Sequence, residues 1–289
     1  MDFIKRSLLS VCYLLIAEFH FPKGQSIAVI GVFKCGTYSL IKMLDDIYPN
    51  VHALQGESRF FSRFYNKGIE SYVKSLPLME CPHDIIIEKS PKYFSHTKAP
   101  SRIYKDSPKS KLILIVCDPV RRVISHFVQR KTIGLISNRT SLAEYLTLPN
   151  GELDDRKVHT GLNKVLKFSQ YAQHIKPWLS LFPRKQILII NGESLVANPY
   201  VEIVKAEKFL NLSNLVRKTT FVKNATGFPC WISYKGRNRI DKRGKGRKHP
   251  ETIGEVKVMV DKLREYFIPR NKEFFNLTGV QFPWPMDKA

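Results

Sequence analysis

A short loop with one embedded lysine is the part of the sequence whose residue types most clearly suit chemistry. The stretch IAVIGVFKCGTYSLIKML, Ile27 to Leu44, opens on an apolar and β-branched run and ends with apolar residues at helical spacing. It predicts a strand, a loop that contains Lys34 and Gly36, and then a helix. Backbone N–H groups at a helix N-terminus favour a bound phosphate or sulfate, because the donors and the dipole act together. The loop is therefore a candidate anion-binding site.

This loop departs from the strict nucleotide-binding pattern G-x-x-x-x-G-K-[ST]. Gly31 and Gly36 have four residues between them, but Thr37 and Tyr38 follow where Lys and then Ser or Thr are required. Lys34 lies inside the loop instead. No Walker-B aspartate is evident in the sequence either, so a P-loop kinase is a weak alternative.

The elements that must position the loop follow from apolar periodicity. Near-continuous apolar runs predict strands that are buried on both faces, at Ile27–Val32, Asp84–Glu88, Lys111–Cys117 and Gln186–Ile190. Helical patterns separate or follow them, at Thr37–Ile47, Val120–Arg130, Asn163–Leu181, Val201–Leu210 and Glu251–Leu277. This alternation predicts an α/β fold with a doubly wound parallel sheet, which binds its ligand at the carboxyl ends of the strands.

The composition is strongly basic, which restricts the class of partner. Lys and Arg outnumber Asp and Glu by 47 to 25, and the formal net charge is +22. Such a chain should bind a polyanion, and nucleic acid, acidic polysaccharide and anionic membrane all qualify. No zinc-finger, helix-turn-helix or RRM pattern accompanies the charge, so we expect no nucleic-acid partner.

The N-terminal segment suggests a targeting signal. Residues 1–22 contain Lys5 and Arg6, followed by the apolar run LLSVCYLLIA. This run is too short to span a bilayer comfortably, and it fits a signal peptide or a short signal anchor. Residues 23–289 would then form a single domain. The alternative is that the N-terminal segment is a buried helix of the fold. A secretory route would make four sequons possible glycan sites, at Asn138, Asn211, Asn224 and Asn276.

A series of motifs resembles one enzyme family. The loop GVFKCGTY is followed, in order, by ESRFF, IEKSPKYF, VCDPVRRVISHF, WLSLFP, ATGFPC and KGRKHP. These resemble the heparan sulfate glucosamine 3-O-sulfotransferases, and the resemblance covers nearly everything after Ser26. It implies a sulfotransferase fold with a P-loop-like phosphosulfate-binding loop. It also implies transfer of a sulfuryl group from 3′-phosphoadenosine 5′-phosphosulfate to the 3-hydroxyl of glucosamine in heparan sulfate, in the Golgi lumen.

The resemblance also implies which residues bind the sulfate donor. Lys34 and the N–H groups of residues 35–37 would hold the 5′-phosphosulfate, and Ser125 with position 117 would hold the 3′-phosphate. The KGR motif supplies a further nucleotide contact. The full donor set is Lys34, Cys35, Gly36, Thr37, Cys117, Ser125, Lys245, Gly246 and Arg247.

Three further positions match family residues that act on the acceptor. Glu57 corresponds to the general base, which would contribute roughly 10²–10⁴-fold by taking the proton of a sugar hydroxyl. Lys89 matches a lysine close to the reacting groups, where it would stabilise developing charge or contact substrate sulfates. Arg59 stands beside the base and would contact substrate, and Glu88 would orient a lysine. Lys34 would stabilise charge on the bridging oxygen.

The chain also differs from the family. The acceptor site is surrounded by replacements, at Phe33, Tyr38, Arg59 and Ser62. Cys117 replaces the arginine of R-D-P, and the loss of one charge-assisted bond would weaken donor binding roughly ten- to a hundredfold. Arg121, one turn further on, is a candidate replacement. A second hypothesis is therefore a sulfotransferase-fold protein that binds heparan sulfate without transfer.

The cysteines fit neither a zinc site nor a readable disulfide framework. Five are present, with no C-x-x-C pair and no close His partner, so no metal is expected. Cys230 matches the first cysteine of a family disulfide, but its partner position is Ile240. In an oxidising lumen Cys35, Cys81, Cys117 and Cys230 should be buried or should form an unexpected pair.

Overall fold

A five-stranded parallel sheet forms the centre of the protein. The computed structural model describes residues 26–79, 81, 83–154, 165–224, 229–233 and 254–286. The strands are β1 (Ser26–Gly31), β2 (Val51–Ala53), β3 (Ile85–Lys89), β4 (Lys111–Val116) and β5 (Ile187–Asn191). They lie in the order β2-β3-β1-β4-β5, and every pairing is parallel. The predicted α/β fold with a doubly wound parallel sheet is confirmed.

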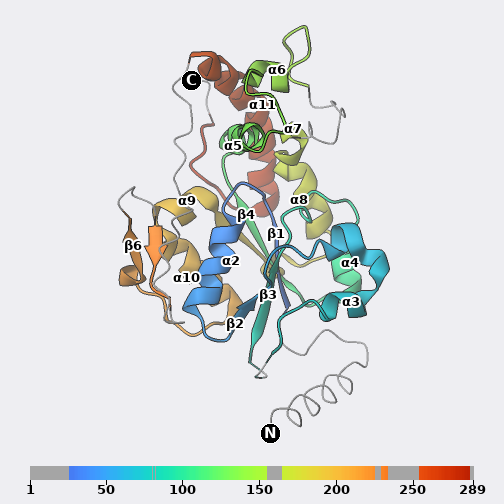
Figure 1. Cartoon of the computed structure of the whole chain (residues 1–289), viewed down its shortest axis with the longest axis vertical. Helices are drawn as coiled ribbons and strands as arrows, with labels where there is room; N and C mark the ends of the chain where they lie inside the picture. Colours follow the sequence, from blue (N-terminus) through green and yellow to red (C-terminus); the bar gives the residue numbers. More distant parts are fainter. Residues whose placement is uncertain are drawn as a thin grey trace.

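The strand composition explains the burial of the sheet. All five residues of β3 are buried, and so are the last five of β4, whose sequence is KLILIV. Such strands need cover on both faces, and Figure 1 shows α2, α9 and α10 on one side and α3, α4 and α8 on the other. The four predicted strands are confirmed to within one residue at each end. The three-residue strand β2 was not predicted, because it is too short to show a periodicity.

The helices begin and end near the predicted positions in most cases. Their bounds are α2 Thr37–Ile47, α3 Ile69–Val73, α4 Ala99–Asp106, α5 Pro119–Thr132, α6 Leu142–Leu146, α7 Val165–Phe168, α8 Tyr171–Leu179, α9 Gly192–Ala197, α10 Pro199–Leu210 and α11 Gly254–Thr278. Short helical turns add η1 Phe60–Phe64, η2 Tyr65–Lys67, η4 Arg184–Gln186 and η5 Lys218–Thr220. A small antiparallel pair consists of β6 Phe221–Lys223 and β7 Pro229–Trp231.

The predicted single helix over Asn163–Leu181 is wrong in its middle. Residues 163 and 164 lie outside the described part, and Ser169 and Gln170 separate α7 from α8. Ser169 Oγ accepts from Arg122 Nε at 2.7 Å and donates to the Val165 carbonyl at 3.0 Å. The hydrogen bond from Arg122 of α5, together with the bond back to α7, therefore occupies Ser169 where a pattern that is helical when judged locally is interrupted.

A second hydrophobic core supports one end of the sheet. It joins α5, α6, α7 and α11 through buried residues that include Val123, Phe127, Leu263 and Phe267. Figure 1 shows these helices gathered at the end where β1 and β4 lead into their loops. The start of α5 is thereby fixed next to the carboxyl ends of the strands, where a doubly wound sheet binds its ligand.

The segments outside the described ranges include several predicted features. The targeting segment 1–22 and the donor residues Lys245, Gly246 and Arg247 all lie there, so their predictions and the domain boundary at residue 23 stay predictions. Within the ranges that the structure does describe, no helix is both long enough and apolar enough to cross a membrane.

Candidate functional site

The predicted anion-binding loop lies between β1 and α2. Lys34 and Gly36 both have positive φ, of 82° and 101°, and Gly36 is the N-cap of α2. The loop folds back on itself, because Cys35 N–H donates to the Val32 carbonyl at 3.2 Å, and Val32 N–H donates to Ile115 of β4 at 2.6 Å. A lysine in the left-handed region costs free energy and persists only where its surroundings fix it, which is common at ligand sites. The first turn of α2 presents its N–H groups at this loop.

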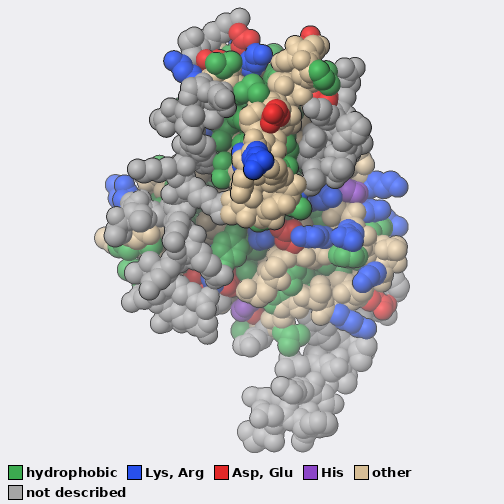
Figure 2. Space-filling view, turned by 45° about the horizontal axis from the view of Figure 1, so that its top comes forward, with side chains coloured by type: hydrophobic (Ala, Val, Ile, Leu, Met, Phe, Trp, Pro, Cys, Tyr) green, Lys and Arg blue, Asp and Glu red, His purple; other side chains and the backbone are tan. Residues whose placement is uncertain are grey.

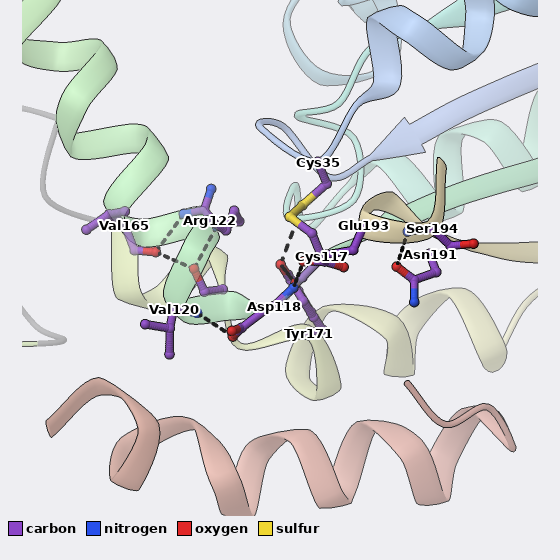
Figure 3. The surroundings of a disulfide bond; sticks show 11 residues. Cys35, Cys117, Asp118, Val120, Arg122, Val165, Tyr171, Asn191, Glu193 and Ser194 are labelled. Carbon is purple, nitrogen blue, oxygen red and sulfur yellow. Dashed lines mark hydrogen bonds between the residues drawn. A yellow bond between two sulfur atoms is a disulfide. The ribbon is translucent and has the colours of Figure 1, made fainter. Parts of the chain in front are cut away.

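A disulfide fastens this loop to the end of the neighbouring strand. Cys35 Sγ is bonded to Cys117 Sγ, with the two Cα atoms 5.3 Å apart (Figure 3). Both residues are buried, and the Tyr171 hydroxyl donates to the Cys117 carbonyl at 2.9 Å. The unexpected pair is therefore the outcome for these two cysteines. Cys230 is buried, as expected, whereas the expectation is wrong for Cys81, which is an exposed thiol. Cys117 consequently offers no thiol to a donor phosphate.

The position of the disulfide follows from the sheet topology. β1 and β4 are neighbours, and the strand order reverses around them, with β3 and β2 on one side and β5 on the other. Cys35 follows β1 and Cys117 follows β4. The bond thus joins two loops at the topological switch point, which is the usual binding position in an open α/β sheet.

Gly192 and Glu193, at the start of α9, complete the back of the loop, and sequence reasoning missed both. A Cβ on Gly192 would lie 2.5 Å from the Cys35 carbonyl oxygen and 3.1 Å from that of Val116, so only glycine fits. Glu193 Oε1 accepts from Asp118 N–H at 2.8 Å, while Glu193 Oε2 is buried and has no hydrogen-bond partner among the described residues. A glycine directly after a buried strand was the signal that could have found this junction.

Asp118 caps α5 at the same place. Its carboxylate accepts from Val120 N–H at 2.9 Å (Figure 3). Burial, with a smaller contribution from the nearby Glu193, raises the pKa of Asp118 to about 6. Two acidic side chains therefore meet behind the disulfide, and burial favours the neutral form of Asp118.

The front of the loop has cationic surroundings. Phe33 packs edge-on against His126 and lies under the guanidinium of Arg122. Arg122 is fully buried and donates to Ser169 and to the Val165 carbonyl. Burial and the nearby positive charges, Lys34 among them, together lower the pKa of His126 to about 3. The replacement Phe33 therefore packs on α5 beside Lys34. Ser125, also on α5, is half-buried.

Glu57 lies between two cations near the end of β3. Its Oε1 is 3.4 Å from Lys89 Nζ, and its Oε2 is 3.1 Å from Arg59 Nε. Lys89 is buried, whereas Glu57 is exposed. In the sheet, Lys89 lies opposite Val29 of β1, two residues before β1 ends. The contact between Glu57 and Lys89 is therefore at the same edge of the sheet as the loop. The structure thus brings together the three residues Glu57, Lys89 and Arg59.

Glu88 has a different role from the predicted one. Its carboxylate accepts hydrogen bonds from hydroxyl groups, because Ser58 and Ser90 both donate to Oε2. Lys89 donates to Glu57 instead. Elsewhere in the described chain, no group of three or more His, Cys, Asp or Glu residues is placed to hold a metal ion.

The fold and the site together define an α/β protein with a candidate anion-binding loop at the switch point of a parallel sheet. The family model of the sulfotransferase domain matches residues 25–275, and the chain belongs to this family. The resemblance drawn from the motifs is confirmed by sequence comparison. Human heparan sulfate glucosamine 3-O-sulfotransferase 6 is 37% identical over 261 residues, which cover 89% of this chain and 72% of that protein.

Further relatives agree. Human heparan sulfate glucosamine 3-O-sulfotransferase 3B1 is 36% identical over 259 residues, and the chain spans only 64% of its length. Among solved structures, the crystal structure of a sulfotransferase from Alicyclobacillus acidocaldarius superposes with a TM-score of 0.66 over 89% of this chain and 97% of that one. Its sequence identity is 18%, so this likeness shows the fold alone.

Proposed function

We propose that the chain transfers a sulfuryl group from 3′-phosphoadenosine 5′-phosphosulfate to the 3-hydroxyl of glucosamine in heparan sulfate. The observation that carries the proposal is the contact of Glu57 with Lys89 at the edge of the sheet that holds the lysine-bearing loop. Relatives that cover 89% of the chain carry this activity in their names.

The residues present fit the anionic donor. The loop offers Lys34 and the N-terminus of α2. Arg122, which is buried, and Arg130 lie on α5 and add positive charge near His126, which Phe33 of the loop contacts. The donor brings a sulfuryl group on a phosphate leaving group. Lys34 and the N–H groups of residues 35–37 would bind its charged end, and Ser125 on α5 would contact the second phosphate.

The chain's own groups account for the movement of the proton. The Glu57 carboxylate accepts the proton of the acceptor hydroxyl as the hydroxyl oxygen forms its bond to sulfur. The bond from sulfur to the phosphate oxygen breaks, and the phosphate leaves with the electron pair. Lys34 stabilises the charge on that oxygen. Lys89 keeps Glu57 in position and stabilises negative charge on the sulfuryl group that is transferred.

An extended basic face supports a polyanionic acceptor. Figure 2 shows Lys and Arg side chains gathered on the side of the molecule that carries α3 and α4. The segment from Glu57 to Ser110 contributes the exposed cations Arg59, Arg63, Lys67, Lys74, Lys92, Lys98, Lys105 and Lys109. The base therefore lies in the same segment as a surface that suits a sulfated chain.

A direct assay tests the proposed function. Purified protein, labelled donor and heparan sulfate should give 3-O-sulfated glucosamine, and Glu57→Gln should lower kcat about 10²-fold or more because it removes the base. Glu273 of α11 forms an exposed ion pair with Lys176 of α8, so Glu273→Gln is the matched control and should keep the wild-type rate. The mechanism fails if the wild type incorporates no label or if Glu57→Gln is as active as the control.

The binder without transfer remains the second candidate, because position 117 holds a disulfide where the family has arginine. Calorimetry separates the two. The enzyme should bind 3′-phosphoadenosine 5′-phosphate, whereas a pure binder should show salt-sensitive heparin binding and no affinity for that nucleotide. The disulfide also supports an oxidising compartment such as the Golgi lumen, since the cytosol keeps thiols reduced.

A further inference from the structure

A buried polar cluster lies beneath the turn that carries Glu57. Its centre is Glu88 of β3, which is only 2% exposed. Ser58 Oγ and Ser90 Oγ both donate to Glu88 Oε2, and Ser58 Oγ lies 2.8 Å from the Tyr93 hydroxyl. A carboxylate removed from water costs free energy unless it is well hydrogen-bonded, so an apolar residue would be the simpler choice for a buried strand. The carboxylate therefore needs a reason to be there.

The cluster holds the backbone of the turn. The three consecutive N–H groups of residues 59–61 donate to its hydroxyl oxygens, at 3.0 Å to Ser90, 3.2 Å to Ser58 and 3.3 Å to Tyr93. Because the N–H groups use the lone pairs of the serine oxygens, the serine hydroxyl protons are free to point at Glu88. Glu88 thus sets the direction of the hydrogen bonds in the whole cluster.

The turn needs this support. Arg59 has a φ of 51°, in the left-handed region that a residue with a Cβ rarely adopts. Its side chain contacts Glu57 Oε2, and Glu57 is the residue directly before Ser58. A turn in this conformation persists only when surrounding contacts fix it. The position of the carboxylate at Glu57 therefore depends on the cluster below.

We propose that Glu88 is a positioning residue that holds Glu57 against Lys89 through Ser58 and Ser90. The predicted effect on the rate rests on the proposed function, whereas the predicted effect on the conformation of the turn does not. A base that moves by about 1 Å from its productive position can lose on the order of 10²-fold in rate. Glu88 itself touches neither substrate nor donor in this proposal.

Two variants test the proposal by separating rate from binding. Glu88→Gln keeps the shape and one acceptor oxygen, but that oxygen carries no charge, so the two charge-assisted hydrogen bonds from Ser58 and Ser90 become weaker neutral ones. Ser58→Ala removes the link between Glu88 and the turn. We expect kcat to fall about 10- to 100-fold in the first and about 3- to 10-fold in the second. The KM for the donor and the affinity for 3′-phosphoadenosine 5′-phosphate should stay within about twofold of wild type, because the loop is untouched.

The control is Ser71→Ala, which removes an exposed hydroxyl that donates to the Gly68 carbonyl outside the cluster. Its kcat should match that of wild type. A general loss of structure would instead lower donor affinity together with kcat. That result, or a kcat for Glu88→Gln equal to that of the control, overturns the proposal.

Hydrogen exchange gives a second readout that needs no activity. The amides of residues 59–61 should exchange at least about tenfold faster in Glu88→Gln, while those of the central strands keep their wild-type rates. Unchanged exchange at residues 59–61 overturns the proposal. Should the wild type transfer no sulfate while the variant still shows faster exchange, the proposed function fails and the positioning role stands.

Discussion

At the scale of single residues, the acidic groups near the site are controlled by different environments. Glu57 is exposed and lies between Lys89 and Arg59, so it is available to a substrate hydroxyl. Asp118 directly follows Cys117 at the start of α5, where it is buried and its N–H donates to Glu193. Glu57 therefore suits proton transfer, whereas Asp118 contributes to stability in a pH-dependent way.

Asp118 determines the sign of this pH dependence. Burial raises its pKa from 3.8 to about 6. The folded state therefore keeps a proton that the unfolded state releases between these values. The contribution to the free energy of unfolding is fully present below the unfolded pKa and is lost as the pH rises through about 6. It amounts to at most about 3 kcal/mol.

The variant Asp118→Asn should remove this dependence, because its amide oxygen can still accept from Val120 N–H but does not titrate. Relative to wild type, its free energy of unfolding should rise by up to about 3 kcal/mol between about pH 4 and pH 7. Urea unfolding of both proteins at several pH values measures this difference. His126 has the opposite effect of pH on stability, but it is present in both proteins, so its contribution cancels in the comparison. Parallel stability curves for the two proteins would rule out this assignment.

At the scale of elements, the disulfide joins the loop after β1 to the loop after β4 across 82 residues of sequence. The carbonyl of Cys35 also packs against Gly192 at the start of α9, so three segments meet at one point. The disulfide thus fixes the loop relative to α5, which carries Ser125.

Cys117→Ser should therefore lower both stability and donor affinity. Loss of a crosslink over this separation costs about 2–4 kcal/mol of unfolding free energy. Thermal unfolding and calorimetry with 3′-phosphoadenosine 5′-phosphate measure the two effects. Cys81→Ser, at an exposed free cysteine, is the control and should change neither. A variant at Cys117 with wild-type melting temperature would show that the bond does not stabilise the loop.

At the scale of the whole molecule, exposed Lys and Arg side chains gather on the face that carries α3 and α4, in the segment that also contains Glu57. The basic face includes cations that follow the base in the sequence, among them Lys98 and Lys105 at α4. Long-range attraction by such a face increases the association rate with a polyanion and weakens as salt screens it.

The double variant Lys98→Ala and Lys105→Ala should bind heparin about tenfold more weakly at low salt, and the difference from wild type should shrink as salt rises. The control pair, Lys257→Ala and Lys272→Ala, removes the same charge from exposed positions of α11. Surface plasmon resonance at several salt concentrations measures both. Equal losses for the two pairs would show that net charge, not this face, determines binding.

The sequence by itself determined four of the five strands of the sheet, its main helices and the family. Continuous apolar runs such as KLILIV are typical of strands that are buried on both faces, and the helical period of Thr37–Ile47 places one face on the core. These are local properties, because they depend on neighbours in the chain. The loop with Lys34 and the match of Glu57 and Lys89 to family motifs needed no structure either.

The tertiary structure alone decided the contacts between segments that are distant in sequence. Cys35 pairs with Cys117 because β1 and β4 become neighbours in the sheet, and nothing in the local sequence states that adjacency. Ser169 interrupts a helical pattern because Arg122 reaches it from another helix. Glu88 turns to Ser58 rather than to a lysine because the end of β3 faces that turn. Each of these outcomes depends on geometry between elements, which periodicity along one element cannot specify.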